Sequence, residues 1–176
     1  MTRGEEEAMI NLAGKVAEYR AMRPDSKGWR RWPTLHESTC LHESAHCIVA
    51  AALGRHPQWA IVAEPAVTET GVTLSGRAHI GYSPEQGAQT EPSLEGNDRL
   101  ESDFSKVIAF CQFIAGERGW FRHMRVLWRE TDVLLRAHWP AVKILSLALR
   151  DKGVVRRQDI EDIMRRWPAN RETTSP

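Results

Sequence analysis

Apolar residues recur at helical spacing in the first part of the chain. In residues 5–22 they return every three or four positions, which predicts an amphipathic helix with one buried face. Thr34 followed by Glu37 matches a capping box, which predicts a second helix that runs to Leu53. The apolar positions of the first helix are Met9, Leu12, Ala13, Val16 and Ala17.

The pattern changes after the second predicted helix. Residues 59–63 and 72–82 are rich in β-branched and aromatic side chains, and Pro65 and Gly71 separate them. This composition predicts two or three short strands. Residues 83–97 are polar and contain two prolines and two glycines, which is typical of a loop.

The remainder of the chain returns to helical spacing. One helix is expected over residues 104–114, with a stop near Gly116. Further helices are expected over residues 120–138, 141–150 and 158–166. The predicted fold class is therefore α+β, mainly helical, with a small β-sheet.

Length and composition predict a single globular domain. The chain has 176 residues, of which 41% are hydrophobic and 27% charged. That length suits one domain better than two. We expect the domain to span residues 1–176, with a core over about 34–167 and a frayed tail over 168–176.

Charge and cysteine content exclude several classes of protein. Lys plus Arg is 24 and Asp plus Glu is 23, so the net charge of +1 argues against nucleic-acid binding driven by bulk charge. Three cysteines are too few for a disulfide scaffold. No signal-peptide pattern follows Met1, and the longest apolar stretch, residues 47–53, is far too short to span a bilayer. We expect a cytoplasmic protein that does not bind membranes.

The segment His-Glu-Ser-Ala-His at residues 42–46 is the strongest chemical signal. Positions i and i+4 share a helix face, so His42 and His46 can bind one Zn²⁺. Glu43, next to the first ligand, can accept a proton from water activated by the metal. The motif predicts a zincin-type catalytic helix; solvent-facing histidines are the plainer alternative.

Other residues near this motif could bind metal in principle. His36 and Cys40 are also spaced i, i+4, but they face a different side of the helix from His42. A surface histidine and a half-buried cysteine are the simpler interpretation of that pair. Cys47 could close a structural zinc site, but it directly follows His46, and adjacent helix residues diverge by about 100°.

Residues 41–54, with the sequence LHESAHCIVAAALG, are followed by a β segment and two further similar stretches, residues 102–107 and 134–155. Together they resemble the peptidase domain of FtsH-like ATP-dependent zinc metalloproteases, and more closely the small stand-alone proteins related to it. Residues 41–54 are the specific part of this likeness. The chain departs from the family at Ala45, where the family usually has glycine, and it has no phosphate-binding loop.

The resemblance implies that His42 and His46 are zinc ligands, that Glu43 is the catalytic carboxylate and that Asp103 completes the metal site. Asp98 is the nearest competitor for the third ligand, and Asp132 and Glu101 are further alternatives. For a single Asp at a helix start, an N-cap is the ordinary explanation.

These observations predict a zinc-dependent metallopeptidase-like hydrolase acting on a peptide or protein substrate. Without an ATPase module, degradation of folded proteins by this chain alone is not expected, which leaves room for a separate ATPase or protein partner. The substrate and the oligomeric state stay open.

A second function comes from a different part of the chain. Arg118, Arg122, Arg125 and Arg129 recur at intervals of three or four residues, and Arg136 continues the series after a longer gap. Trp120 and Trp128 lie between these arginines, and Trp139 follows them. Such a stripe could serve a non-catalytic module that binds protein or nucleic acid. Nucleic acid is the less expected partner because the net charge is close to zero.

Overall fold

The computed structural model describes residues 1–22, 34–63, 66–68, 71–73, 76–81 and 102–169. The predicted class is confirmed: the fold is mainly helical with a small antiparallel sheet. The predicted loop over residues 83–97 lies outside the described residues. In chain order the elements are α1 (Arg3–Ala21), α2 (Leu35–Ala52), β1 (His56–Val62), β2 (Ala66–Thr68), β3 (Gly71–Thr73), β4 (Gly76–Gly81), α3 (Asp103–Ala137), α4 (Trp139–Lys152), β5 (Val154–Arg156) and α5 (Arg157–Arg166).

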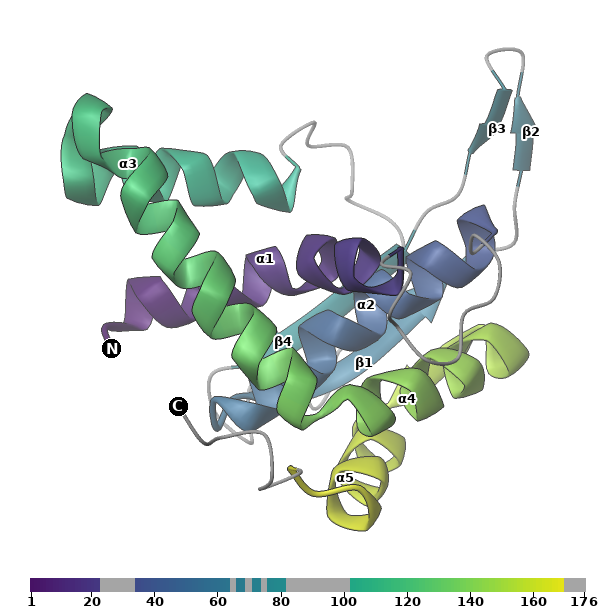
Figure 1. Cartoon of the computed structure of the whole chain (residues 1–176). Coiled ribbons are helices and arrows are strands. Elements are labelled where there is room, and N and C mark those ends of the chain that lie inside the picture. Colours follow the sequence, from purple (N-terminus) through teal and green to yellow (C-terminus); the bar gives the residue numbers. More distant parts are fainter. Residues whose placement is uncertain (23–33, 64–65, 69–70, 74–75, 82–101, 170–176) are drawn as a thin grey trace.

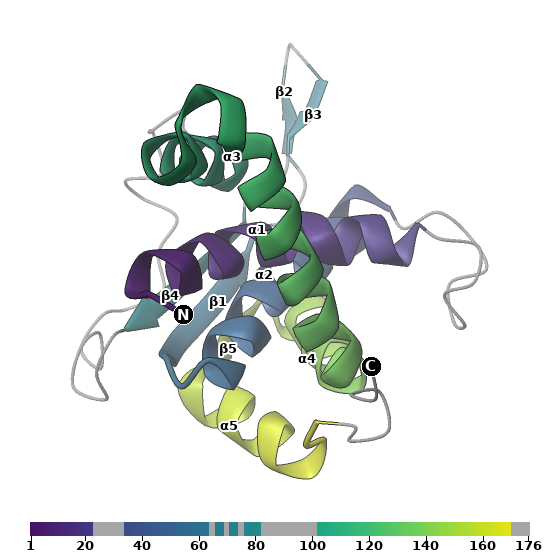
Figure 2. The same cartoon turned by 60° about the vertical axis from the view of Figure 1, so that its left-hand side comes forward.

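Helix α2 is the centre of the fold. It packs against α1 on one side and against β1 and β4 on the other, with α4 alongside (Figures 1 and 2). Its start follows the predicted capping box, because Thr34 accepts a hydrogen bond from the Glu37 backbone and Glu37 accepts one from Thr34. Leu41, Ala45 and Ile48 are fully buried, so most of the helix that carries the histidine motif lies inside the molecule.

The larger sheet has the order β4-β1-β5, and both pairs are antiparallel. The first predicted strand is present as β1 but begins earlier, at His56. The second, over residues 72–82, is divided between β3, which pairs with β2, and β4. Strand β5 was not predicted, because three residues between two helices give no periodic signal.

Helix α3 consists of two helical arms that meet at Gly116 (Figure 1). The predicted interruption of the helix near this glycine is present. The chain resumes helical conformation directly after Gly116, earlier than the predicted start at residue 120. Gly116 has φ +65°, a conformation that residues with a Cβ rarely adopt. The bend lets the first arm begin beside α2 while the second arm crosses α1. In the described ranges, no helix has the length and apolar character that a bilayer-spanning segment needs.

Candidate metal centre

Helix α2 presents His42 and His46 side by side, one turn apart. Their ring centroids are 4.7 Å apart and their planes make an angle of 68°. His46 is buried, with 5% of its surface exposed. The i, i+4 spacing therefore produces the shared face that the sequence predicts.

Asp103 joins the two histidines from the first turn of α3. One carboxylate oxygen, Oδ2, lies 3.3 Å from His46 Nε2 and 4.0 Å from His42 Nε2. The ordinary explanation of an Asp at a helix start, an N-cap, does not apply here, because Ser102 occupies that position and accepts a hydrogen bond from the Ser105 backbone. The Asp103 carboxylate is therefore available to face the histidines.

The other nitrogen of each ring, Nδ1, forms a hydrogen bond to a residue of α1. His42 Nδ1 donates to Glu18 Oε1 at 2.8 Å, and His46 Nδ1 donates to the backbone oxygen of Ile10 at 2.6 Å. A carbonyl oxygen only accepts, so His46 Nδ1 carries a proton, and its Nε2 is directed toward Asp103. This buried Nε2 has no hydrogen-bond partner among the described residues.

These residues fit a zinc ion. The ligand atoms of His42, His46 and Asp103 all lie within 4.8 Å of one another. In a tetrahedral site with bonds of 2.0–2.1 Å, ligand atoms are about 3.3 Å apart. The 3.3 Å between Asp103 Oδ2 and His46 Nε2 matches this spacing, and the 4.0 Å between Oδ2 and His42 Nε2 is longer. Two imidazoles and one carboxylate are also a donor set that leaves one position open in catalytic zinc sites.

The charges at the site also suit a cation. Burial raises the pKa of Asp103, but its contacts with His42 and His46 outweigh that effect and hold the pKa well below its usual range. Burial lowers the pKa of His42, but Asp103 and Glu18 outweigh it and raise the pKa to about 9. With this pKa, His42 carries a proton at neutral pH that offsets the nearby carboxylates, and a metal ion bound at its Nε2 would have to displace that proton.

Glu43 lies on the inner side of α2 and is only 7% exposed. Burial raises its pKa, and the nearby histidines offset this only in part. A Cβ added to Gly76, the first residue of β4, would lie 2.7 Å from Glu43 Oε1. The Glu43 carboxylate is thus enclosed between the histidine helix and the start of an edge strand.

The other sequence candidates do not join this cluster. Asp132 pairs with Arg20 at 3.1 Å and also with Arg136, so it is wrong as a third ligand. Asp98 and Glu101 lie outside the described residues. Within the described ranges, the group of side chains that could hold a metal ion contains neither the His36 and Cys40 pair nor Cys47.

Sequence reasoning missed the part that α1 plays at the site. Gly14 lies opposite the His42 ring, and a Cβ added there would be 2.4 Å from three of its atoms. A glycine inside a helix costs about 1 kcal/mol relative to alanine, so its presence among apolar residues is a signal of close packing. The residues of α1 that border the two histidines are Ile10, Gly14 and Glu18.

We expect Gly14→Ala to weaken zinc binding strongly, because the new methyl group would displace the His42 ring from its place opposite Asp103. Alanine favours the helix itself, so a loss of helix propensity would not explain the effect. The measurement is zinc affinity by competition with a chromophoric chelator. Ala13→Gly, one residue away in the same helix, is the control for general disturbance of α1. Unchanged zinc affinity in Gly14→Ala would contradict the close contact.

The comparisons with known proteins give the chain no family. No protein-family model matches it, and no match is found among curated proteins or among solved structures.

Proposed function

We propose that this protein is a zinc-dependent metallopeptidase-like hydrolase that cleaves peptide bonds. The observation that carries the proposal is the meeting of His42, His46 and Asp103 beside the buried carboxylate of Glu43. The likeness of residues 41–54 to FtsH-like zinc metalloproteases supports peptide as the substrate class.

In this proposal His42, His46 and Asp103 hold the metal. When bound, zinc would supply Lewis acidity and lower the pKa of water toward about 7. Glu43 accepts the proton of the attacking water and returns it to the leaving amine. Its raised pKa suits both steps, because a carboxylate that is too acidic holds a proton poorly.

Strand β4 supports an extended substrate. It pairs with β1 along one side and is one of the two edge strands of its sheet in the described part of the chain. Its first residue, Gly76, adjoins Glu43. A peptide that adds to a free strand edge is held through its backbone, with little demand on its sequence.

The test uses purified protein, metal analysis and an unstructured fluorogenic peptide. We expect one zinc per chain, cleavage that stops with a chelator, and recovery of cleavage when zinc is restored. Protein that binds no zinc under zinc-replete conditions, or cleavage that is insensitive to chelation, would contradict the proposal. A separate ATPase partner is proposed only for folded substrates, so it is not needed in this assay.

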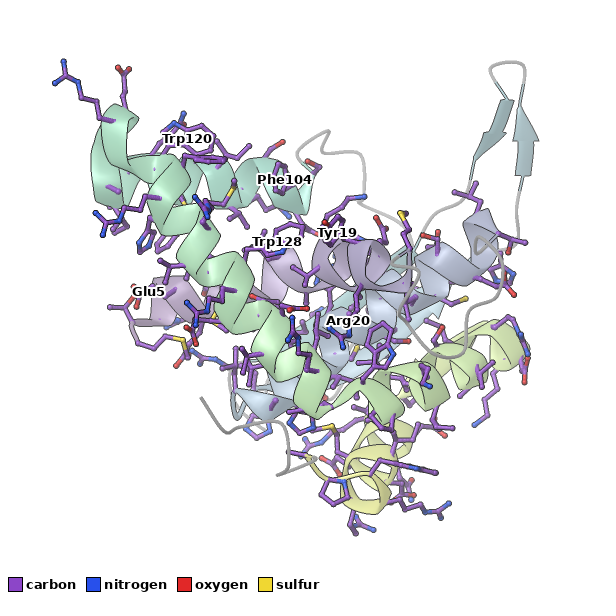
Figure 3. All side chains as sticks on the ribbon, in the orientation of Figure 1. Glu5, Tyr19, Arg20, Phe104, Trp120 and Trp128 are labelled. Carbon is purple, nitrogen blue, oxygen red and sulfur yellow. The ribbon has the colours of Figure 1, made fainter. Side chains whose placement is uncertain are left out.

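A second candidate, a non-catalytic binding module, rests on the second arm of α3. Arg118, Arg122, Arg125 and Arg129 are exposed and form no ion pair with any described residue. The tryptophans of this arm are less accessible. Trp128 packs on Tyr19 (Figure 3), and their ring centroids are 6.0 Å apart. Because Trp120 and Trp128 are only half-exposed and the net charge of the chain is only +1, an acidic protein suits this face better than single-stranded nucleic acid.

A further inference from the structure

Helix α1 accepts a hydrogen bond from each of the two histidines, through the ring nitrogen that does not face Asp103. The acceptors of these two hydrogen bonds differ in kind. His46 is held by a backbone oxygen, that of Ile10, which a substitution cannot remove. His42 is held by a side chain, that of Glu18, at 2.8 Å. Of these two contacts, only the one from Glu18 depends on a side chain, so a substitution of Glu18 can remove it.

The Glu18 carboxylate is fixed by contacts at both of its oxygens. Oε1 accepts from His42 Nδ1, while Oε2 accepts from Lys15 Nζ at 2.8 Å. The side chains of Glu18 and His42 are 18% and 16% exposed, so solvent screens their contact only weakly. A carboxylate in this position sets both the orientation of the ring and the nitrogen that carries its proton.

We propose that Glu18 is a positioning residue of the metal centre, which holds His42 with Nε2 directed at the metal and makes α1 part of the zinc site. The inference rests on the proposed zinc site, but not on the reaction carried out there. Carboxylates that accept from the second nitrogen of a ligating histidine also make that histidine a stronger donor, and their loss costs about 10–100-fold in metal affinity.

The experiment compares zinc affinity, by chelator competition, in wild type, Glu18→Ala and Glu18→Gln. We expect roughly 10–100-fold weaker binding in Glu18→Ala. The zinc affinity of Glu18→Gln should lie between those of wild type and Glu18→Ala, because the Gln amide oxygen can still accept from His42 Nδ1 but carries no charge. Glu7→Gln, an equivalent change in the same helix at a residue that pairs with Arg3, is the matched control and should bind zinc as wild type does.

A second measurement separates positioning from general stability. In ¹⁵N-labelled, zinc-loaded protein, the Nδ1–H proton of His42 should give a hydrogen-bonded signal that moves in Glu18→Gln and disappears in Glu18→Ala. A variant that is merely less stable would unfold at a lower temperature but keep this signal. If Glu18→Ala does not fold, the positioning role is tested with Glu18→Gln alone, by its zinc affinity together with the His42 Nδ1–H signal.

The outcomes distinguish this inference from the proposed function. Wild-type protein that binds zinc but cleaves no peptide, with weaker zinc binding in Glu18→Ala, would support Glu18 and contradict the peptidase. Affinities within twofold of wild type in both Glu18 variants, or an equal loss in Glu7→Gln, would overturn the positioning role. Wild-type protein that binds no zinc would overturn both.

Discussion

Replacing Glu43 by Gln should leave zinc bound and abolish most hydrolysis. Gln has nearly the shape of Glu but cannot accept a proton from water, so the rate is expected to fall by about 100- to 10,000-fold. The three proposed ligands, His42, His46 and Asp103, are unchanged in this variant, so zinc content should stay at one per chain. The measurement is peptide cleavage together with metal analysis on the same samples.

Stability provides an internal check on this variant. Glu43 is buried and burial raises its pKa, so a neutral side chain of the same size should not destabilise the fold. The unfolding temperature of Glu43→Gln should therefore equal or exceed that of wild type. Glu130→Gln, at an exposed position of α3, is the control for the substitution itself. Unchanged cleavage in Glu43→Gln would contradict the mechanism.

Replacing Asp103 by Asn should remove most of the zinc. In the proposed site the Asp103 carboxylate is the anionic ligand, and its Oδ2 is the atom that both histidines face. A neutral amide binds zinc much more weakly than a carboxylate does. Zinc affinity should therefore fall by more than the roughly 10–100-fold expected when a residue that only hydrogen-bonds to a ligand is lost. Metal analysis after dialysis and chelator competition measure the effect.

Asp132→Asn is the matched control for this change. The two aspartates were both candidates in the sequence, but Asp132 pairs with Arg20 and Arg136 instead of facing the histidines. We expect this control to bind zinc normally, even if its pairing with Arg20 contributes to stability. Full zinc binding in Asp103→Asn would show that the third ligand lies elsewhere, with Asp98 and Glu101 the next to test.

Local signals in the sequence were sufficient for the helix that carries the site. The Thr34 and Glu37 capping box and the spacing of His42 and His46 both act within one or two turns. Such short-range chemistry can be interpreted from a single chain. The selection of Asp103 came from resemblance to a family, and spacing alone could not separate it from Asp132.

The support from α1 could not be predicted in the same way. Glu18 and Ile10 occupy ordinary positions in an amphipathic helix, and their role depends on how α1 lies across α2. Strand β5 likewise exists because β1 offers it a partner, as in the pairing of Ala60 with Val155. Tertiary contacts of this kind have no period in the sequence.

The position of Asp103 at the start of α3 also has a consequence for folding. His46 and Asp103 belong to helices that are separated in the chain by strands β1 to β4 of the described residues, so an ion held by both would act as a reversible long-range cross-link. Such a link forms only once the first arm of α3 has reached α2. Binding to the folded state alone adds about 4.1 kcal/mol of stability at a thousandfold excess of free metal over Kd. Zinc starvation should therefore lower the unfolding temperature of this protein, whether or not a substrate is present.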